Sequence, residues 1–175
     1  MRAFLALYPD EAARGELAEV APEDADDVRV TDMADWHVTV RFLGELDEPA
    51  ASAVARAASG ALATAAPFNV RLGPTTALGT GARVLFVPAA GAEAVARLLD
   101  AALEGLAEPR DGPFRGHLTL ARARGRSRLP ATLSGIPIAV AFRASEVALV
   151  VSRLEPARAV HQIVARFPLG AGGST

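Results

Sequence analysis

Two short segments carry the same residue types at the same spacing, and both contain groups that can move protons. Residues 36–40 read WHVTV and residues 116–120 read GHLTL, so each holds a His-x-Thr-x pattern in which x is apolar. Val, Thr and Leu favour β-strands, whose side chains alternate between the two faces. His37 and Thr39 therefore share one face of a predicted strand, and His117 and Thr119 share one face of another. Two such strands across a groove would direct two imidazoles and two hydroxyls at one small anion.

This set of side chains suits acid–base chemistry on a phosphate ester. Imidazole titrates near neutral pH, so one histidine can hold a proton while its partner accepts one. Thr39 and Thr119 could each donate a hydrogen bond to a phosphate oxygen. Arg122, expected just past the end of the second motif strand, could bind the phosphate with its planar fork. A single His-x-Thr in a strand usually marks only a polar sheet face, and the duplication favours the functional interpretation.

Length and composition restrict the class of protein. The 175 residues fit one domain, or one domain built from two similar halves, and 51% are hydrophobic. The net charge of −2 gives no overall nucleic-acid-binding surface, although all 18 basic residues are Arg, which binds phosphate well. The absence of Cys excludes disulfides, thiolate catalysis and Cys-ligated zinc. With no signal peptide or membrane-spanning stretch apparent, we expect a soluble, cytoplasmic protein.

The order of predicted elements indicates an α+β fold. A helix followed by a motif strand occurs twice, and the two motif histidines are 80 residues apart. We therefore expect a bilobal architecture of two pseudo-symmetric antiparallel β-sheet lobes with outer helices around a central cleft. Residues 1–169 would form this single domain, and residues 170–175 a flexible tail. Predicted helices span 9–20, 48–65 and 91–106; predicted strands span 1–8, 28–30, 36–43, 67–72, 82–87, 114–121, 136–142, 146–152 and 160–167.

Strand parity gives expectations for the side chains around the first motif. Trp36 and Phe42 have the opposite parity from His37, so both are predicted to pack in the core. Arg41 has the same parity as His37 and could reach the cleft, or remain a charge at its rim. A further set of arginines alternates after the second motif and could contact an RNA backbone or lie in a solvated loop, namely Arg122, Arg124, Arg126 and Arg128.

The chain resembles a known family in four segments. These are residues 1–7 (MRAFLAL), 36–45 (WHVTVRFLGE), 114–122 (FRGHLTLAR) and the closing strand pattern from 152 to 169. Together they resemble the two-histidine (2H) phosphoesterases, and specifically the bacterial RNA 2',3'-cyclic phosphodiesterases, also called RNA 2'-5' ligases. The likeness covers essentially the whole chain.

The resemblance implies both an activity and roles for residues. It implies opening of a 2',3'-cyclic phosphate at an RNA end to a 2'-phosphate, without metal or cofactor, and joining of RNA ends through a 2'-5' bond. His37 would be the general acid and His117 the general base, while Thr39, Thr119 and Arg122 would bind the phosphate. The chain departs from the family at Gly116, where Pro is usual, and at His161, where Tyr is frequent. We interpret His161 as a structural histidine with satisfied hydrogen bonds.

Two other functions stay open on the sequence. One is a 2H phosphoesterase acting on another small substrate, such as a cyclic phosphate of ADP-ribose or a 2'-5' linked oligonucleotide. The other is a non-catalytic module that binds RNA ends; the presence of both histidines and both threonines argues against it. The expected partners are RNA ends or small nucleotides with a 2',3'-cyclic phosphate, with no membrane partner, and the expected oligomeric state is a monomer.

Overall fold

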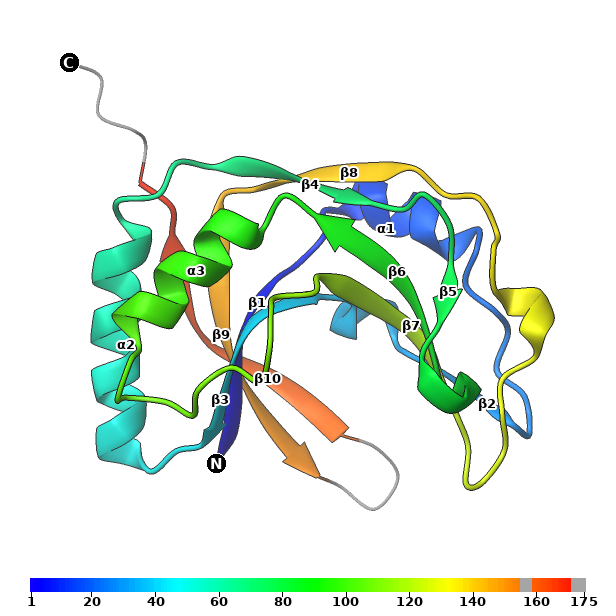
Figure 1. Cartoon of the computed structure of the whole chain (residues 1–175), viewed down its shortest axis with the longest axis horizontal. Helices are drawn as coiled ribbons and strands as arrows, with labels where there is room; N and C mark the ends of the chain where they lie inside the picture. The colour runs from blue at the N-terminus through cyan, green and yellow to red at the C-terminus, as the bar shows by residue number, and fades with distance from the viewer. Residues whose placement is uncertain (155–158, 171–175) are drawn as a thin grey trace.

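A strongly curled antiparallel sheet organises the chain in the computed structural model, which describes residues 1–154 and 159–170 (Figure 1). The α-helices are α1 (Glu11–Ala18), α2 (Glu48–Leu62) and α3 (Glu93–Ala102), and the 3-10 turns are η1 (Met33–Asp35), η2 (Thr80–Ala82) and η3 (Ala131–Leu133). The strands are β1 (Arg2–Leu7), β2 (Val28–Val30), β3 (Val38–Glu45), β4 (Phe68–Leu72), β5 (Ala77–Leu78), β6 (Val84–Ala90), β7 (His117–Ala123), β8 (Val140–Ala144), β9 (Glu146–Leu154) and β10 (Ala159–Pro168).

The sheet divides into two lobes that meet at the two motif strands. Its order is β10-β9-β1-β3-β7-β6-β4-β8, while β2 pairs with β7 and β5 with β6. Between β3 and β7 a single position is paired, Val38 with Leu118. The first lobe is therefore β1, β3, β9 and β10, and the second is β2 and β4 to β8. The predicted α+β fold, with two antiparallel lobes around a cleft, is confirmed.

The helices cover the outer side of this sheet. α2 and α3 pack on one another and contact β10 and β3, whereas α1 contacts β8 at the other end of the sheet (Figure 1). Each helix buries an apolar stripe, such as Val54, Ala58 and Leu62 of α2. The N-terminus of α2 is capped by Asp47, whose carboxylate accepts from the Ala50 N–H at 2.8 Å. The three predicted helices are confirmed, with slightly shorter bounds.

Several predicted element ends differ from those in the structure. β7 extends to Ala123, so Arg122 lies inside the strand instead of beyond it. The predicted strand 136–142 begins only at Val140, and Pro137, which lacks an N–H, sits in the segment before it. Gly170, the first residue of the predicted tail, donates its N–H to the Leu62 carbonyl at 3.3 Å. The rest of that predicted tail, residues 171–175, lies outside the described residues.

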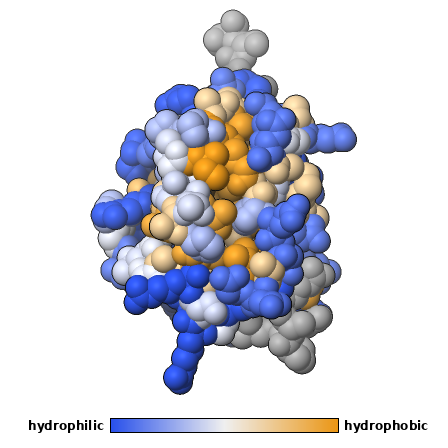
Figure 2. Space-filling model, turned by 90° about the vertical axis from the view of Figure 1, so that its right-hand side faces the viewer, coloured by the Kyte–Doolittle hydropathy of each residue, from blue (hydrophilic) through white to orange (hydrophobic). Residues whose placement is uncertain are grey.

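The surface at the end of the molecule where β5 and η3 lie is uneven in polarity. Apolar side chains form a band through the middle of this face, and hydrophilic side chains border it on both sides (Figure 2). Within the described part of the chain, the helices are all too short or too polar to cross a lipid bilayer.

Candidate active site

One cleft at the junction of the lobes contains all five residues that the sequence singled out. It has a volume of about 410 Å³, and its lining includes His37, Thr39, His117, Thr119 and Arg122. His37 directly precedes β3, which begins at Val38 and not at residue 36 as predicted, Thr39 lies in β3, and the last three residues lie in β7. The duplicated motif therefore forms one site in three dimensions, although its halves are 80 residues apart in the sequence.

The two motif histidines are held by matching hydrogen bonds. Nδ1 of His37 lies 2.6 Å from the carbonyl oxygen of Asp35, and Nδ1 of His117 lies 3.0 Å from that of Arg115. A carbonyl oxygen can only accept, so each Nδ1 carries the hydrogen and donates it. Nε2 is then the nitrogen of each neutral ring that can exchange a proton with a molecule in the cleft. In both motifs the accepting carbonyl belongs to the residue two positions before the histidine, a repeat that the motif itself does not reveal.

Burial and positive neighbours keep His37 neutral in the free protein. Burial lowers the pKa of His37 from 6.5 to about 4, against the opposing effect of its bond to the Asp35 carbonyl. The positive charges of His161, His117 and Arg122 also contribute to this low value. At neutral pH, His37 can therefore accept a proton through Nε2.

Arg122 supplies fixed positive charge at the same site. It lies on β7 directly opposite Arg29 of β2, and its side chain lines the cleft. Burial lowers the pKa of Arg122, and the positive charge of Arg29 lowers it further. A guanidinium nevertheless stays protonated in proteins, so Arg122 is a permanent cation that is repelled by the positive charge of Arg29. An anion bound in the cleft would relieve that repulsion.

A bulge in β3 reverses the predicted orientation of Arg41 and Phe42. The pairing of β3 with β1 skips Val40, so Val40 and Arg41 both turn into the interior, and Arg41 is only 3% exposed. The alternation is therefore shifted by one residue at Phe42, before a second irregularity in the pairing at Leu43. Phe42 is therefore 46% exposed and lines the cleft, and its predicted place in the core is wrong. Arg41 neither reaches the cleft nor lies at its rim.

Arg41 instead anchors the segment that leads into β7. Its Nε lies 3.1 Å from the Asp100 carboxylate, and its Nη2 donates to the Glu108 carbonyl at 2.6 Å. Arg110 donates to both oxygens of the same carboxylate and, through Nη2, to the Val40 carbonyl at 2.6 Å. These bonds tie α3 and the loop after it to β3. The network thereby fixes the two motif strands relative to each other.

Of the predictions for the remaining side chains, the one for Trp36 is confirmed, and the structure differs from expectation at Arg124 and His161. Trp36 is buried at 1% exposure, as predicted, and its Nε1–H donates to the Thr31 carbonyl at 3.1 Å. Arg124 does not project as a free contact for RNA, because it pairs with Asp24 at 2.5 Å. His161 does not have satisfied hydrogen bonds; it lines the same cleft as His37. Sequence reasoning missed the other cleft residues, which are Arg2, Phe4, Thr31, Asp35, Phe42, Arg110, Phe114, Arg115 and Ser152.

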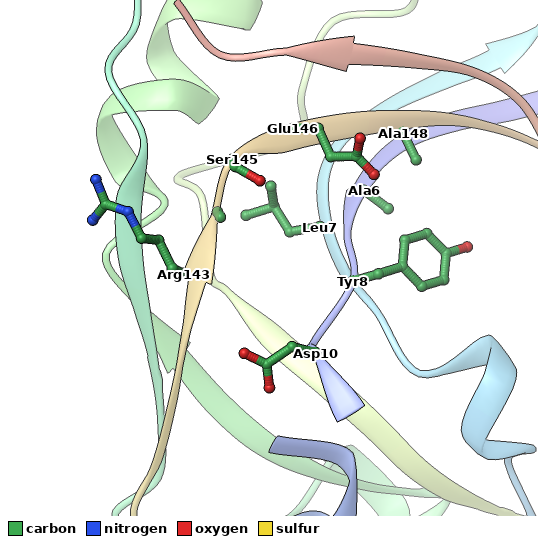
Figure 3. A pocket seen from close by; sticks show the side chains of 9 residues that line it. Ala6, Leu7, Tyr8, Asp10, Arg143, Ser145, Glu146 and Ala148 are labelled. Carbon is green, nitrogen blue, oxygen red and sulfur yellow. The ribbon is translucent and has the colours of Figure 1, made fainter. Parts of the chain in front are cut away.

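A second, smaller cavity of about 180 Å³ lies beside the first lobe (Figure 3). Tyr8, Asp10, Arg143, Ser145 and Glu146 contribute its polar lining, and the guanidinium of Arg143 points away from Tyr8 (Figure 3). It contains no histidine and neither motif. The larger cleft is therefore the candidate active site. Among residues 1–154 and 159–170, no group of three or more His, Asp or Glu is placed to hold a metal ion.

Comparison with known proteins identifies the family. The family model of the 2'-5' RNA ligase superfamily matches residues 9–156, so the chain belongs to this superfamily, in agreement with its resemblance to the 2H phosphoesterases. No curated protein matches the chain in sequence.

Solved structures share the fold over nearly the whole chain. The protein TT0787 of Thermus thermophilus is 26% identical with a TM-score of 0.86, over 99% of this chain and 100% of that one. Escherichia coli LigT complexed with phosphate is 19% identical with a TM-score of 0.72, over 97% of each chain. LigT complexed with 3'-AMP is 20% identical with a TM-score of 0.73, over 96% of this chain and 97% of that one.

Proposed function

We propose that the protein is an RNA 2',3'-cyclic phosphodiesterase that hydrolyses a terminal 2',3'-cyclic phosphate to a 2'-phosphate without a metal ion or cofactor. The main support is the matched pair of imidazoles, each of which donates through Nδ1 to a backbone carbonyl and lines the same cleft. Hydrolysis of a phosphodiester moves one proton from water and another to the leaving oxygen. Two imidazoles with free Nε2 atoms in one cleft suit this pair of transfers.

In the proposed reaction, the two histidines act on opposite sides of the phosphorus. Nε2 of His117 takes a proton from water as the water oxygen bonds to phosphorus, and the bond from phosphorus to O3' breaks. Nε2 of His37 gives its proton to O3', so the product carries a 2'-phosphate and a 3'-hydroxyl. His37 must therefore be protonated in the complex, and the negative charge of a bound phosphate would raise its pKa above about 4.

Three further side chains would bind the phosphate in this proposal. Thr39 and Thr119 are placed on opposite strands of the cleft, so their hydroxyls can donate to different non-bridging oxygens. Arg122 can offer two parallel N–H groups to the same phosphate. Donors that are in place before the reaction stabilise the charge that grows in the transition state.

Two aromatic rings support a nucleotide as the substrate. Phe42 lines the cleft from the first lobe and Phe114 from the segment before β7, and each has a guanidinium 5.2 Å from its ring centre, Arg2 and Arg110 respectively. Unpaired bases stack on such rings in RNA-binding proteins. The volume of about 410 Å³ is near the lower end for small-molecule sites, which suits one terminal nucleotide better than a longer segment. LigT, which shares the fold, has been solved with phosphate and with 3'-AMP.

The same site could also join RNA ends. When the 5'-hydroxyl of a second RNA replaces water, the same proton transfers form a 2'-5' phosphodiester and release O3'. The alternatives are a small cyclic nucleotide such as ADP-ribose cyclic phosphate, a 2'-5' oligonucleotide, and a binding module without turnover. We propose a cytoplasmic monomer as the working form.

Turnover of three cyclic phosphates by the wild type, by two histidine variants and by one control variant separates these functions. The substrates are a short RNA ending in 2',3'-cyclic phosphate, a 2',3'-cyclic mononucleotide and ADP-ribose cyclic phosphate. We expect the RNA to have the highest kcat/KM, and His37→Gln and His117→Gln each to lower kcat by about 10²- to 10⁴-fold. Arg56→Gln, at an exposed position of α2 that does not line the cleft, is the control and should keep full activity. Binding of the RNA by the wild type without any turnover would refute the enzyme proposal.

A further inference from the structure

A third imidazole, that of His161, forms part of the cleft wall. His161 lies on β10 opposite Ser152 of β9, lines the cleft, and is 20% exposed. Its ring meets the ring of His37 edge-on, with 5.3 Å between centroids and 74° between planes, and meets Phe4 at 5.2 Å and 77°. Phe4 in turn stacks on His37 at 4.9 Å. The position of the His37 ring therefore depends on the ring of His161.

Asp35 lies between the two histidines. Its backbone carbonyl accepts from His37, while its carboxylate oxygen Oδ1 lies 3.9 Å from Nδ1 of His161. That Nδ1 is buried and has no hydrogen-bond partner in the described part of the chain. A buried polar atom without a partner is costly. Protonation of His161 would strengthen its contact with Asp35, because the charged ring would then present an N–H donor to the carboxylate.

Burial is the largest influence against that protonation. Burial lowers the pKa of His161, the carboxylate of Asp35 raises it, and the positive charge of Arg122 lowers it. Asp35 is the carboxylate that shares the cleft with His161. The basic side chains that share it are His37 directly before β3, Arg122 and His117 on β7, Arg2 on β1, and Arg110 and Arg115 before β7. Ser152 on β9 also lines the cleft and is uncharged. The basic side chains of this set outnumber its single carboxylate, that of Asp35. A bound phosphate oxyanion would offset them and reverse the balance.

We propose that His161 is a positioning residue that takes up a proton from solvent when a phosphate oxyanion enters the cleft, pairs with Asp35, and holds the His37 ring for proton transfer. The inference rests on the proposed function, because it requires the cleft to receive such an anion. His161 itself exchanges no proton with the substrate; it acts through His37.

Proton NMR can follow this proton directly, since the chain has three histidines and hence three Cε1–H signals. The signals are assigned with single His→Gln variants and titrated with and without saturating sulfate, an oxyanion whose charge is fixed across this pH range. We expect sulfate to raise the titration midpoint of His161 by about 1 pH unit or more. Asp35→Asn should reduce this rise. Asp26→Asn, in the exposed loop before β2, is the matched control and should leave it unchanged.

The outcomes distinguish this inference from the proposed function. If sulfate moves the signals of His37 and His117 but leaves the His161 midpoint unchanged, the role of His161 is refuted and the oxyanion site stands. If sulfate moves none of the three, both fall. A kinetic test separates charge from packing: His161→Phe keeps an aromatic ring against Phe4 and His37 but cannot be protonated. We expect its kcat to be as low as that of His161→Gln, and wild-type kcat in His161→Phe would overturn the proposal.

Discussion

Replacing His37 by Gln should make the protein less sensitive to acid unfolding. Because burial lowers the pKa of His37 from 6.5 to about 4, the folded protein resists a proton that the unfolded chain accepts. The unfolded state therefore binds more protons between these two values, and stability falls as the pH drops through this window. This difference in proton binding should lower the unfolding free energy of the wild type by roughly 3 kcal/mol between pH 7 and pH 4. His37→Gln has no such group and should be spared this loss.

Urea denaturation at pH 7 and pH 4 measures the effect. The relevant quantity is the loss of unfolding free energy between the two pH values, so any constant cost of the substitution cancels. Ser152→Ala alters the same cleft wall without a titrating group and should lose as much stability as the wild type. Equal losses in the wild type and in His37→Gln would refute the reasoning, since His37 would then titrate alike in both states.

Three further predictions concern the framework and the chemistry. Asp100→Asn should lower the unfolding free energy by about 3 kcal/mol, because Arg41 is only 3% exposed and would lose its counter-charge; a loss below about 1 kcal/mol in urea denaturation would contradict this. Gly91→Ala should lower the melting temperature, since Gly91 has φ +105 and a Cβ there would collide with the Asn69 carbonyl. Its matched control, Gly15→Ala in α1, meets no atom within 4 Å and should raise stability by about 0.5–1 kcal/mol. Turnover should survive a chelator such as EDTA, and loss of activity that added metal restores would contradict metal-free catalysis.

The sequence predicted the motif residues because their identity and spacing repeat. Each His-x-Thr-x segment needed only local alternation to place His and Thr on one face, and the structure brings both segments into one cleft. The same alternation of side chains along the strand also predicted that Trp36 packs in the core, and Trp36 is buried. The alternation predicted the wrong orientation for Arg41 and Phe42, because the bulge at Val40 shifts it by one residue. A bulge depends on how two strands pair, and a single strand's sequence carries no clear sign of it.

Other parts of the site depend on contacts between distant segments. The histidine on β10 enters the cleft because β10 follows β9 and β1 across the sheet, an order that the sequence does not state. The low pKa of His37 likewise arises from burial and from charges on other strands. The network of Arg41, Arg110 and Asp100 joins three segments that show no relation in the sequence. Local patterns therefore predicted which motif side chains line the cleft, while the residues that surround them were found only from the fold.

Identification of the product formed from an RNA with a terminal 2',3'-cyclic phosphate is the measurement that decides the proposed reaction. The protein, with EDTA present, is incubated with the RNA, and the end group is resolved as 2'- or 3'-phosphate. The arrangement of His37 as acid and His117 as base predicts a 2'-phosphate, formed by the wild type and lost in His117→Gln. A 3'-phosphate would contradict the assigned leaving oxygen, and an unchanged cyclic phosphate would contradict the proposed activity itself.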